Sequence, residues 1–157
     1  MILAVSNSTI LSNFALAKRP DLLLQAFPGL VMPTAVWEEI GVGERLGLLP
    51  KLDWSRIPVV RPDPARLAEV ERSKPRLDRG EAACIALARA HGAVVVTDDR
   101  DARRVAQHLG LKISGTLGAL ILLVQREILT ISEADAVLAT MIKEGYRSPS
   151  SSIGKFL

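Results

Sequence analysis

Short apolar runs alternate along the chain with longer segments in which apolar residues recur every three or four positions. Runs that are apolar throughout are typical of strands buried on both faces of a parallel sheet. Helical spacing between such runs indicates crossover helices, so the order predicts an α/β three-layer sandwich with a central, mainly parallel sheet flanked by helices. The strands are expected at residues 1–5, 30–32, 57–60, 93–96 and 111–113.

Polar or proline-containing turns mark where the helices between these runs begin. The Gly- and Pro-rich residues 41–56 predict a loop. No linker divides the chain, so we expect one domain over residues 1–147, followed by a flexible, serine-rich tail at 148–157. The helices are expected after Ser6–Thr9, over 20–27, from Pro33 to about residue 40, over 65–71, over 78–90, between Asp101 and Gly110, over 115–125 and over 132–144.

Composition narrows the class of protein. The 157 residues are 48% hydrophobic and 24% charged, which fits a folded domain rather than a disordered chain. A single cysteine, Cys84, excludes an intramolecular disulfide and an all-cysteine zinc site, and it lies among apolar residues typical of a core. The longest apolar run, at 117–124, is too short to span a bilayer. We therefore expect a cytoplasmic protein without membrane association.

The candidate chemistry lies where the predicted strands end, because ligands of parallel sheets bind beyond the carboxyl ends of the strands. Oxygen ligands without clustered histidine or cysteine favour Mg²⁺ or Mn²⁺, and such ions promote phosphodiester cleavage. Neighbouring arginines would suit phosphate contacts. The polar residues after strands are Asn7, Asp98, Asp99, Ser114 and Thr116, which Glu39 and Glu81 could join from flanking helices, with Arg100, Arg103 and Arg104 close by.

Each of these residues also has a purely structural interpretation. Thr97–Asp99 equally fits a helix N-cap, with its acids near the positive end of the helix dipole. Glu81 lies in a first turn, where carboxylates are common, and Glu39 fits a solvated position in mid-helix. The arginines after Asp99 fit an ordinary exposed helix face. Spacing alone does not decide between these interpretations.

Four segments together resemble the PIN domain family, in particular a prokaryotic subgroup close to VapC-type toxins. No single segment is specific, but their order and spacing extend over nearly the whole chain. The segments are the first strand with Ser6–Thr9, Val36–Ile40, Arg79–Ala83 running into Ala86–Ala88, and Val96–Asp99 with Ala102–Arg103 and the Gly115–Gly118 sequence GTLG.

The resemblance implies a Mg²⁺- or Mn²⁺-dependent ribonuclease that is the toxin of a toxin–antitoxin pair. It implies RNA as substrate, a small antitoxin and a second copy of the chain as partners. The exposed-looking leucines of residues 22–24 could form the dimer surface or the core. The resemblance places catalysis on Glu39, Glu81 and Asp99, metal binding on Glu81, Asp99 and Asp98, supporting roles on Asn7, Thr97, Asp98 and Thr116, and RNA contacts on Arg79, Arg100, Arg103 and Arg104.

Asn7 departs from the family pattern, which has an aspartate after the first strand. Asparagine keeps the shape and one acceptor oxygen but carries no charge, so metal affinity and catalysis should be weaker. A catalytically degenerate PIN domain that binds RNA or a protein without cleavage is therefore the alternative hypothesis. A receiver-like phosphoryl-transfer domain is disfavoured, because it needs an acidic pair after the first strand and Ser6–Thr9 has none.

The distribution of charge adds one observation. The net charge is +3, and residues 74–112 hold eight Lys and Arg against five Asp and Glu. The rest of the chain holds twelve of each kind, so the whole excess lies in the stretch with Glu81, Asp98 and Asp99. This is the distribution expected of an acidic metal pocket bordered by phosphate-binding cations.

Overall fold

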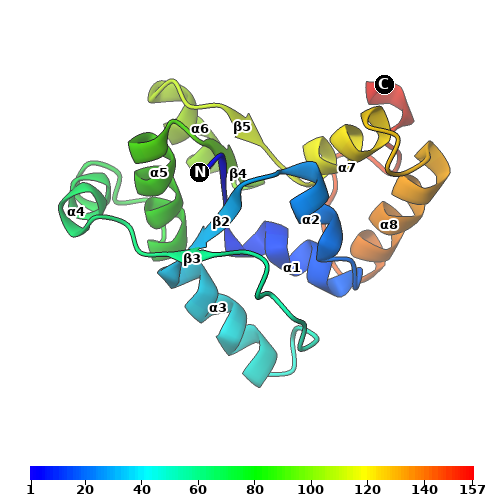
Figure 1. The fold of residues 1–157 in the computed structure, drawn as a ribbon, viewed down its shortest axis with the longest axis horizontal. Coiled ribbons are helices and arrows are strands. Elements are labelled where there is room, and N and C mark those ends of the chain that lie inside the picture. The colour runs from blue at the N-terminus through cyan, green and yellow to red at the C-terminus, as the bar shows by residue number, and fades with distance from the viewer.

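A five-stranded, wholly parallel sheet forms the centre of the molecule (Figure 1). The computed structural model describes all residues from 1 to 157. The strand order β3-β2-β1-β4-β5 places the first strand in the middle of the sheet, and the α/β prediction is confirmed. The strands are β1 (Ala4–Ser6), β2 (Leu30–Pro33), β3 (Val59–Val60), β4 (Val94–Val96) and β5 (Ile113–Ser114).

The middle strand is apolar because both of its faces are covered. Val5 pairs with Val31 of β2 on one side and with Val95 of β4 on the other, and all three side chains are buried. The strand is shorter than its apolar run, which begins at Met1. The backbone of Leu3 already forms hydrogen bonds with Gly29 and Val94, but the Leu3 side chain is half exposed. The buried part of the strand therefore begins at Ala4.

Helices cover both faces of the sheet (Figure 1). On one side α5 packs on β1, β2 and β4, with α4 and α6 against it, and on the other α2 packs on α7 and α7 on α8. The leucines at 22 and 23 are fully buried, so they belong to the core. The helices are α1 (Ser8–Leu16), α2 (Asp21–Ala26), α3 (Thr34–Arg45), α4 (Pro64–Ser73), α5 (Arg79–His91), α6 (Arg100–His108), α7 (Thr116–Gln125) and α8 (Ile131–Lys143), and a 3₁₀ helix, η1 (Gly154–Phe156), follows.

Helix α5 lies directly on the sheet because its buried face consists largely of small residues. Residues 82–88 are all buried and include four alanines and Cys84. Burial in this apolar layer raises the pKa of the Cys84 thiol well above its ordinary value. A capping box between Asp78 and Glu81 begins the helix, and Gly92, at a φ of 62°, ends it in the left-handed conformation that glycine adopts without strain.

Two predicted helix boundaries are wrong, the end of α3 and the start of α8. Helix α3 continues to Arg45 through Gly43, whose missing Cβ leaves room for the side chain of Leu49 in the following loop. Helix α8 is capped by Thr130 and Glu133 rather than by Ser132 and its neighbours. Asp135 lies beyond the first turn of this helix, and its carboxylate binds residues at the end of the chain.

The last residues of the chain lie against α8. Asp135 accepts hydrogen bonds from Ser152 Oγ at 3.0 Å and from the backbone N–H of Ile153 at 2.9 Å. The Ile153 side chain is completely buried in the core. The domain boundary at residue 147 stays a prediction. None of the helices has the length and apolar character needed to cross a membrane.

Replacing Ile153 with alanine should destabilise the protein, because it leaves a cavity in the core. We expect the free energy of unfolding to fall by about 2–4 kcal/mol. Phe156→Ala is the matched control: that side chain is 46% exposed, so its loss should cost within about 0.5 kcal/mol. Urea unfolding of the two variants checks this, and equal losses would show that the end of the chain is not packed as described.

Candidate active site at the carboxyl end of the sheet

The predicted site residues lie at one edge of the sheet, beyond the carboxyl ends of β1, β4 and β5. Asn7 follows β1, and Thr97, Asp98 and Asp99 follow β4. The parallel register places these positions side by side, since Ser6 pairs with Val96. The edge is therefore where the topology predicts a ligand site.

Asn7 connects the two central strands and begins a helix. Its Oδ1 accepts the backbone N–H of Ile10 at 3.2 Å as the N-cap of α1, and its Nδ2 donates to Thr97 Oγ1 at 2.7 Å. Its own backbone N–H donates to Val96 at 3.2 Å. The side chain is 3% exposed. Both of its polar atoms are thus used within the fold.

Thr97 carries this connection on to Asp99. Thr97 Oγ1 accepts the backbone N–H of Asp99 at 3.1 Å in addition to the Asn7 amide. Asp99 is the N-cap of α6, and its Oδ2 accepts from Ala102 N at 2.8 Å. The cap interpretation of Asp99 is confirmed. Its other oxygen, Oδ1, accepts no hydrogen bond from the protein and remains available to a ligand.

Asp98 connects β4 to the start of α7. Its Oδ1 accepts from Thr116 N at 3.1 Å, and its Oδ2 accepts from Thr116 Oγ1 at 2.6 Å. A Cβ on Gly115 would collide with the Asp98 carboxylate, so glycine is required for this close approach. Thr116 also accepts the buried Asn13 amide at 3.0 Å. The GTLG segment thus holds Asp98, and neither oxygen of Asp98 is free.

Tyr146 adjoins this network, and sequence reasoning missed it. Burial, together with the negative charge of Asp98, raises its pKa to about 12. With Thr9 and Asn13 it lines a hollow of about 370 Å³. The only sequence signal is that it is the sole tyrosine of the chain.

Glu39 reaches the site from α3. Its Oε2 accepts from Ser8 Oγ at 2.8 Å, and a Cβ on Gly80 would collide with its Oε1. The absent side chain at position 80 therefore lets the carboxylate lie against the first turn of α5. Partial burial raises the pKa of Glu39, and the charge of Asp78 adds to this rise.

Glu81 lies in that first turn and is the most strongly perturbed carboxyl of the site. Its Oε2 accepts the backbone N–H of Asp78 at 3.2 Å within the capping box. Its pKa is raised to about 7, chiefly by burial and also by the charges of Asp78, Asp99 and Glu39, while the hydrogen bond from Asp78 N lowers it. The structure thus brings Glu39, Glu81 and Asp99 into one electrostatically coupled cluster, hereafter the acidic cluster.

The acidic cluster follows a single pattern. Each member has one carboxylate oxygen anchored by a protein hydrogen bond, and no hydrogen bond from the protein reaches the other. None of the three takes part in an ion pair. Negative charge therefore accumulates here without an ion pair to neutralise it, although the charge of Arg79 lowers the pKa of Glu39.

A family model described as "DUF3368: PIN domain" matches residues 3–157. The chain belongs to this PIN domain family. The crystal structure of PAE2754 from Pyrobaculum aerophilum shares its fold, with a TM-score of 0.53 and 19% sequence identity over 82% of this chain and 98% of that one. No curated protein matches the sequence. PIN domains are generally nucleases and generally use divalent metal ions.

The donor chemistry of this PIN domain fits a divalent ion. All the free donors of the acidic cluster are carboxylate oxygens, which hard cations prefer, and the unbalanced negative charge favours a cation. As the side chains lie, no three Asp, Glu, His or Cys residues form a group that could hold a metal ion. Binding would therefore require the free oxygens to turn inward while the anchored ones stay in place.

The four predicted RNA-contacting arginines of the PIN domain differ in their surroundings. Arg103 is largely structural, because its Nε donates to Thr97 O at 2.9 Å and its Nη2 lies 3.8 Å from Asp98 Oδ1. Arg79 faces Glu38 at 3.6 Å on the surface. Arg100 and Arg104 are exposed and form no ion pair.

The raised pKa of Glu81 should make stability depend on pH. Ionisation is harder in the folded protein than in the unfolded chain, so the free energy of unfolding should fall as pH rises from about 4.5 to about 7. Glu81→Gln should remove most of this fall, because glutamine keeps the capping box but does not titrate, and the raised pKa of Glu39 accounts for the remainder. Urea midpoints measured across this range test the prediction.

Glu133→Gln provides the matched control. Glu133 occupies the equivalent position in the capping box of α8, but hydrogen bonds from Thr130 lower its pKa. It affects stability only at lower pH, so this variant should keep the fall between about pH 4.5 and 7. Loss of the fall in both variants, or in neither, would contradict the assignment to Glu81.

Proposed function

We propose that this PIN domain is a Mg²⁺- or Mn²⁺-dependent endoribonuclease. The observation that carries the proposal is the acidic cluster, in which Glu39, Glu81 and Asp99 each keep one oxygen anchored and one free at the carboxyl edge of the sheet. Family membership supports nuclease chemistry. Anchored carboxylates suit metal binding because one oxygen is already held in place, so only the free oxygen has to turn toward the ion.

Each residue of the cluster has a defined part in this mechanism. Glu81 and Asp99, with Glu39, would hold the ion, which when bound acts as a Lewis acid on a phosphate oxygen. The capping bonds to Asp78 N and Ala102 N hold one oxygen of Glu81 and one of Asp99, and the free oxygen of each carboxylate would turn toward the ion. Asn7 acts through Thr97, whose hydroxyl fixes the start of the Asp99 turn.

We further propose that the protein is the toxin of a toxin–antitoxin pair in the cytoplasm, with a small antitoxin and a second copy of the chain as partners. The resemblance to VapC-type toxins supports this. The exposed apolar side chains of Trp37, Val42 and Leu46, on and just after the helix that carries Glu39, also offer a surface for a protein partner.

Expression of this protein in bacterial cells should arrest their growth, and the Glu81→Gln variant should relieve the arrest.

The second candidate function is RNA binding without cleavage. Asn7 favours it, because the neutral amide replaces a charge and both of its polar atoms are engaged in the fold. A unit charge at 4 Å contributes about 4 kcal/mol of gross attraction at an effective dielectric of 20. Its absence weakens metal binding unless Glu39, Glu81 and Asp99 compensate.

Cleavage of a single-stranded RNA pool in Mn²⁺ distinguishes the two functions. We expect the native protein to cleave, Glu81→Gln to lose at least about tenfold in rate, and Glu133→Gln to match the native protein. Asn7→Asp should fold, since Thr97 can turn its hydroxyl to donate to the new carboxylate, and it should bind Mn²⁺ more tightly in titration calorimetry. Cleavage by Asn7→Asp alone would favour the non-cleaving function for the native chain.

A further inference from the structure

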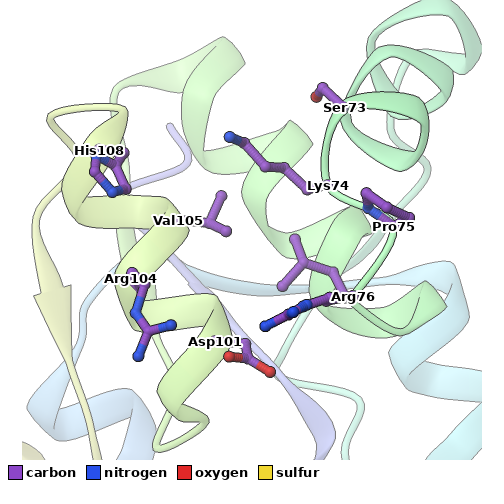
Figure 2. A pocket seen from close by; sticks show the side chains of 9 residues that line it. Ser73, Lys74, Pro75, Arg76, Asp101, Arg104, Val105 and His108 are labelled. Carbon is purple, nitrogen blue, oxygen red and sulfur yellow. The ribbon is translucent and has the colours of Figure 1, made fainter.

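A basic hollow of about 300 Å³ lies between the loop after α4 and one side of α6 (Figure 2). Lys74 and Arg76 line it from the loop, and Arg104 and His108 line it from the helix. Asp101 is the only acidic residue in its wall. The sequence pattern indicates Arg104 as a candidate but not the other three basic residues, because the four come close together only when the loop packs against α6.

The cations of this hollow have no carboxylate partner. Neither Lys74, Arg76 nor Arg104 forms an ion pair, whereas Arg19, Arg79, Arg89 and Arg103 each do. Asp101 offsets one charge, which leaves a net positive wall. Unpaired cations that line a shared concavity give it a positive potential, which attracts an anion.

Most of the surface of the hollow is apolar. Pro75 and Leu77 from the loop and Val105 from α6 line the same hollow. Leu77 and Val105 are half-buried against the core, so this part of the wall is fixed. A ligand that combines a phosphate with a sugar or base would contact both kinds of surface, and the volume is at the lower limit for small-ligand pockets.

The hollow adjoins the acidic cluster through two elements. The lining loop leads directly into Asp78, which caps α5 one turn before Glu81. Helix α6 begins at its cap, Asp99, and Arg104 follows five residues later, which is ~7.5 Å along the helix axis. A flexible strand of nucleic acid could therefore occupy both places at once.

We infer that this hollow binds one nucleotide of single-stranded RNA, with its phosphate on Arg76, Arg104 and Lys74, while a neighbouring part of the same strand lies at the acidic cluster. The inference rests on the proposed function. A single strand fits better than a duplex, because a separate nucleotide can enter a concavity and a paired one cannot. Phosphate contacts carry no sequence information, so this site sets affinity and register rather than sequence preference.

Anisotropy of a short fluorescein-labelled oligouridylate tests the inference in EDTA, which prevents cleavage. Arg76→Gln/Arg104→Gln should raise the Kd about tenfold, and the slope of log Kd against log salt between about 50 and 200 mM should fall by about 0.7 to 1.4. Asp101→Asn should bind more tightly than the native protein. The charge-matched control Arg56→Gln/Lys143→Gln, whose cations lie outside the hollow, should bind like the native protein.

Equal losses in the hollow variant and the control would overturn the inference, since binding would then follow net charge alone. The inference would also be overturned if the hollow variant lost as much affinity for labelled polyglutamate as for RNA, because the hollow would then be assigned to acidic peptides.

The Mn²⁺ cleavage assay on the same proteins separates this inference from the proposed function. If the native protein cleaves RNA and the hollow variant binds like it, only the inference fails. If the hollow variant binds less and no protein cleaves, the inference stands and the nuclease proposal fails.

Discussion

The hydrogen bond from the Asn7 amide to Thr97 holds the two central strands together at the edge where all the candidate chemistry lies. Thr97 in turn fixes the backbone of Asp99, so the position of one metal-binding candidate depends on Asn7. An amide can donate this bond and a carboxylate cannot. A neutral residue here also adds no repulsion to Glu39, Glu81 and Asp99. The neutral amide therefore lowers the repulsion within this edge at the expense of its attraction for cations, a trade-off common at active sites.

The acidic cluster and the basic hollow are connected through the segments at which α5 and α6 begin. Glu81 and Asp99 lie at the N-termini of α5 and α6, where the helix dipoles stabilise negative charge. This interaction offsets part of the burial and repulsion that raise the pKa of Glu81. The excess of positive charge in residues 74–112 includes the three cations of the hollow, Lys74, Arg76 and Arg104, and none of the carboxylates of the cluster is ion-paired.

The sequence predicted the architecture well, because apolar runs such as Val94–Val96 are unambiguous when both faces of a strand are buried. It also identified the three carboxylates of the acidic cluster. It could not show that Asp98 is structural, since that depends on Gly115 and Thr116 approaching from another element. The basic hollow was missed for the same reason: Arg76 and Arg104 are 28 positions apart along the chain. Local signals were ambiguous at the start of α8, where Thr130 and Ser132 are both residues that cap helices. The structure uses Thr130 with Glu133 as the cap, and Asp135 instead binds the backbone of Ile153.

Helix α5 carries Glu81 at its start and the only thiol of the protein one turn later. The reactive form of cysteine is the thiolate, and burial both disfavours that form and blocks access to it. Oxidants and alkylating agents therefore cannot reach the protein through Cys84 while α5 lies on the sheet. The thiol becomes reactive only when that helix separates from the strands, so chemical damage at this position follows unfolding and does not cause it.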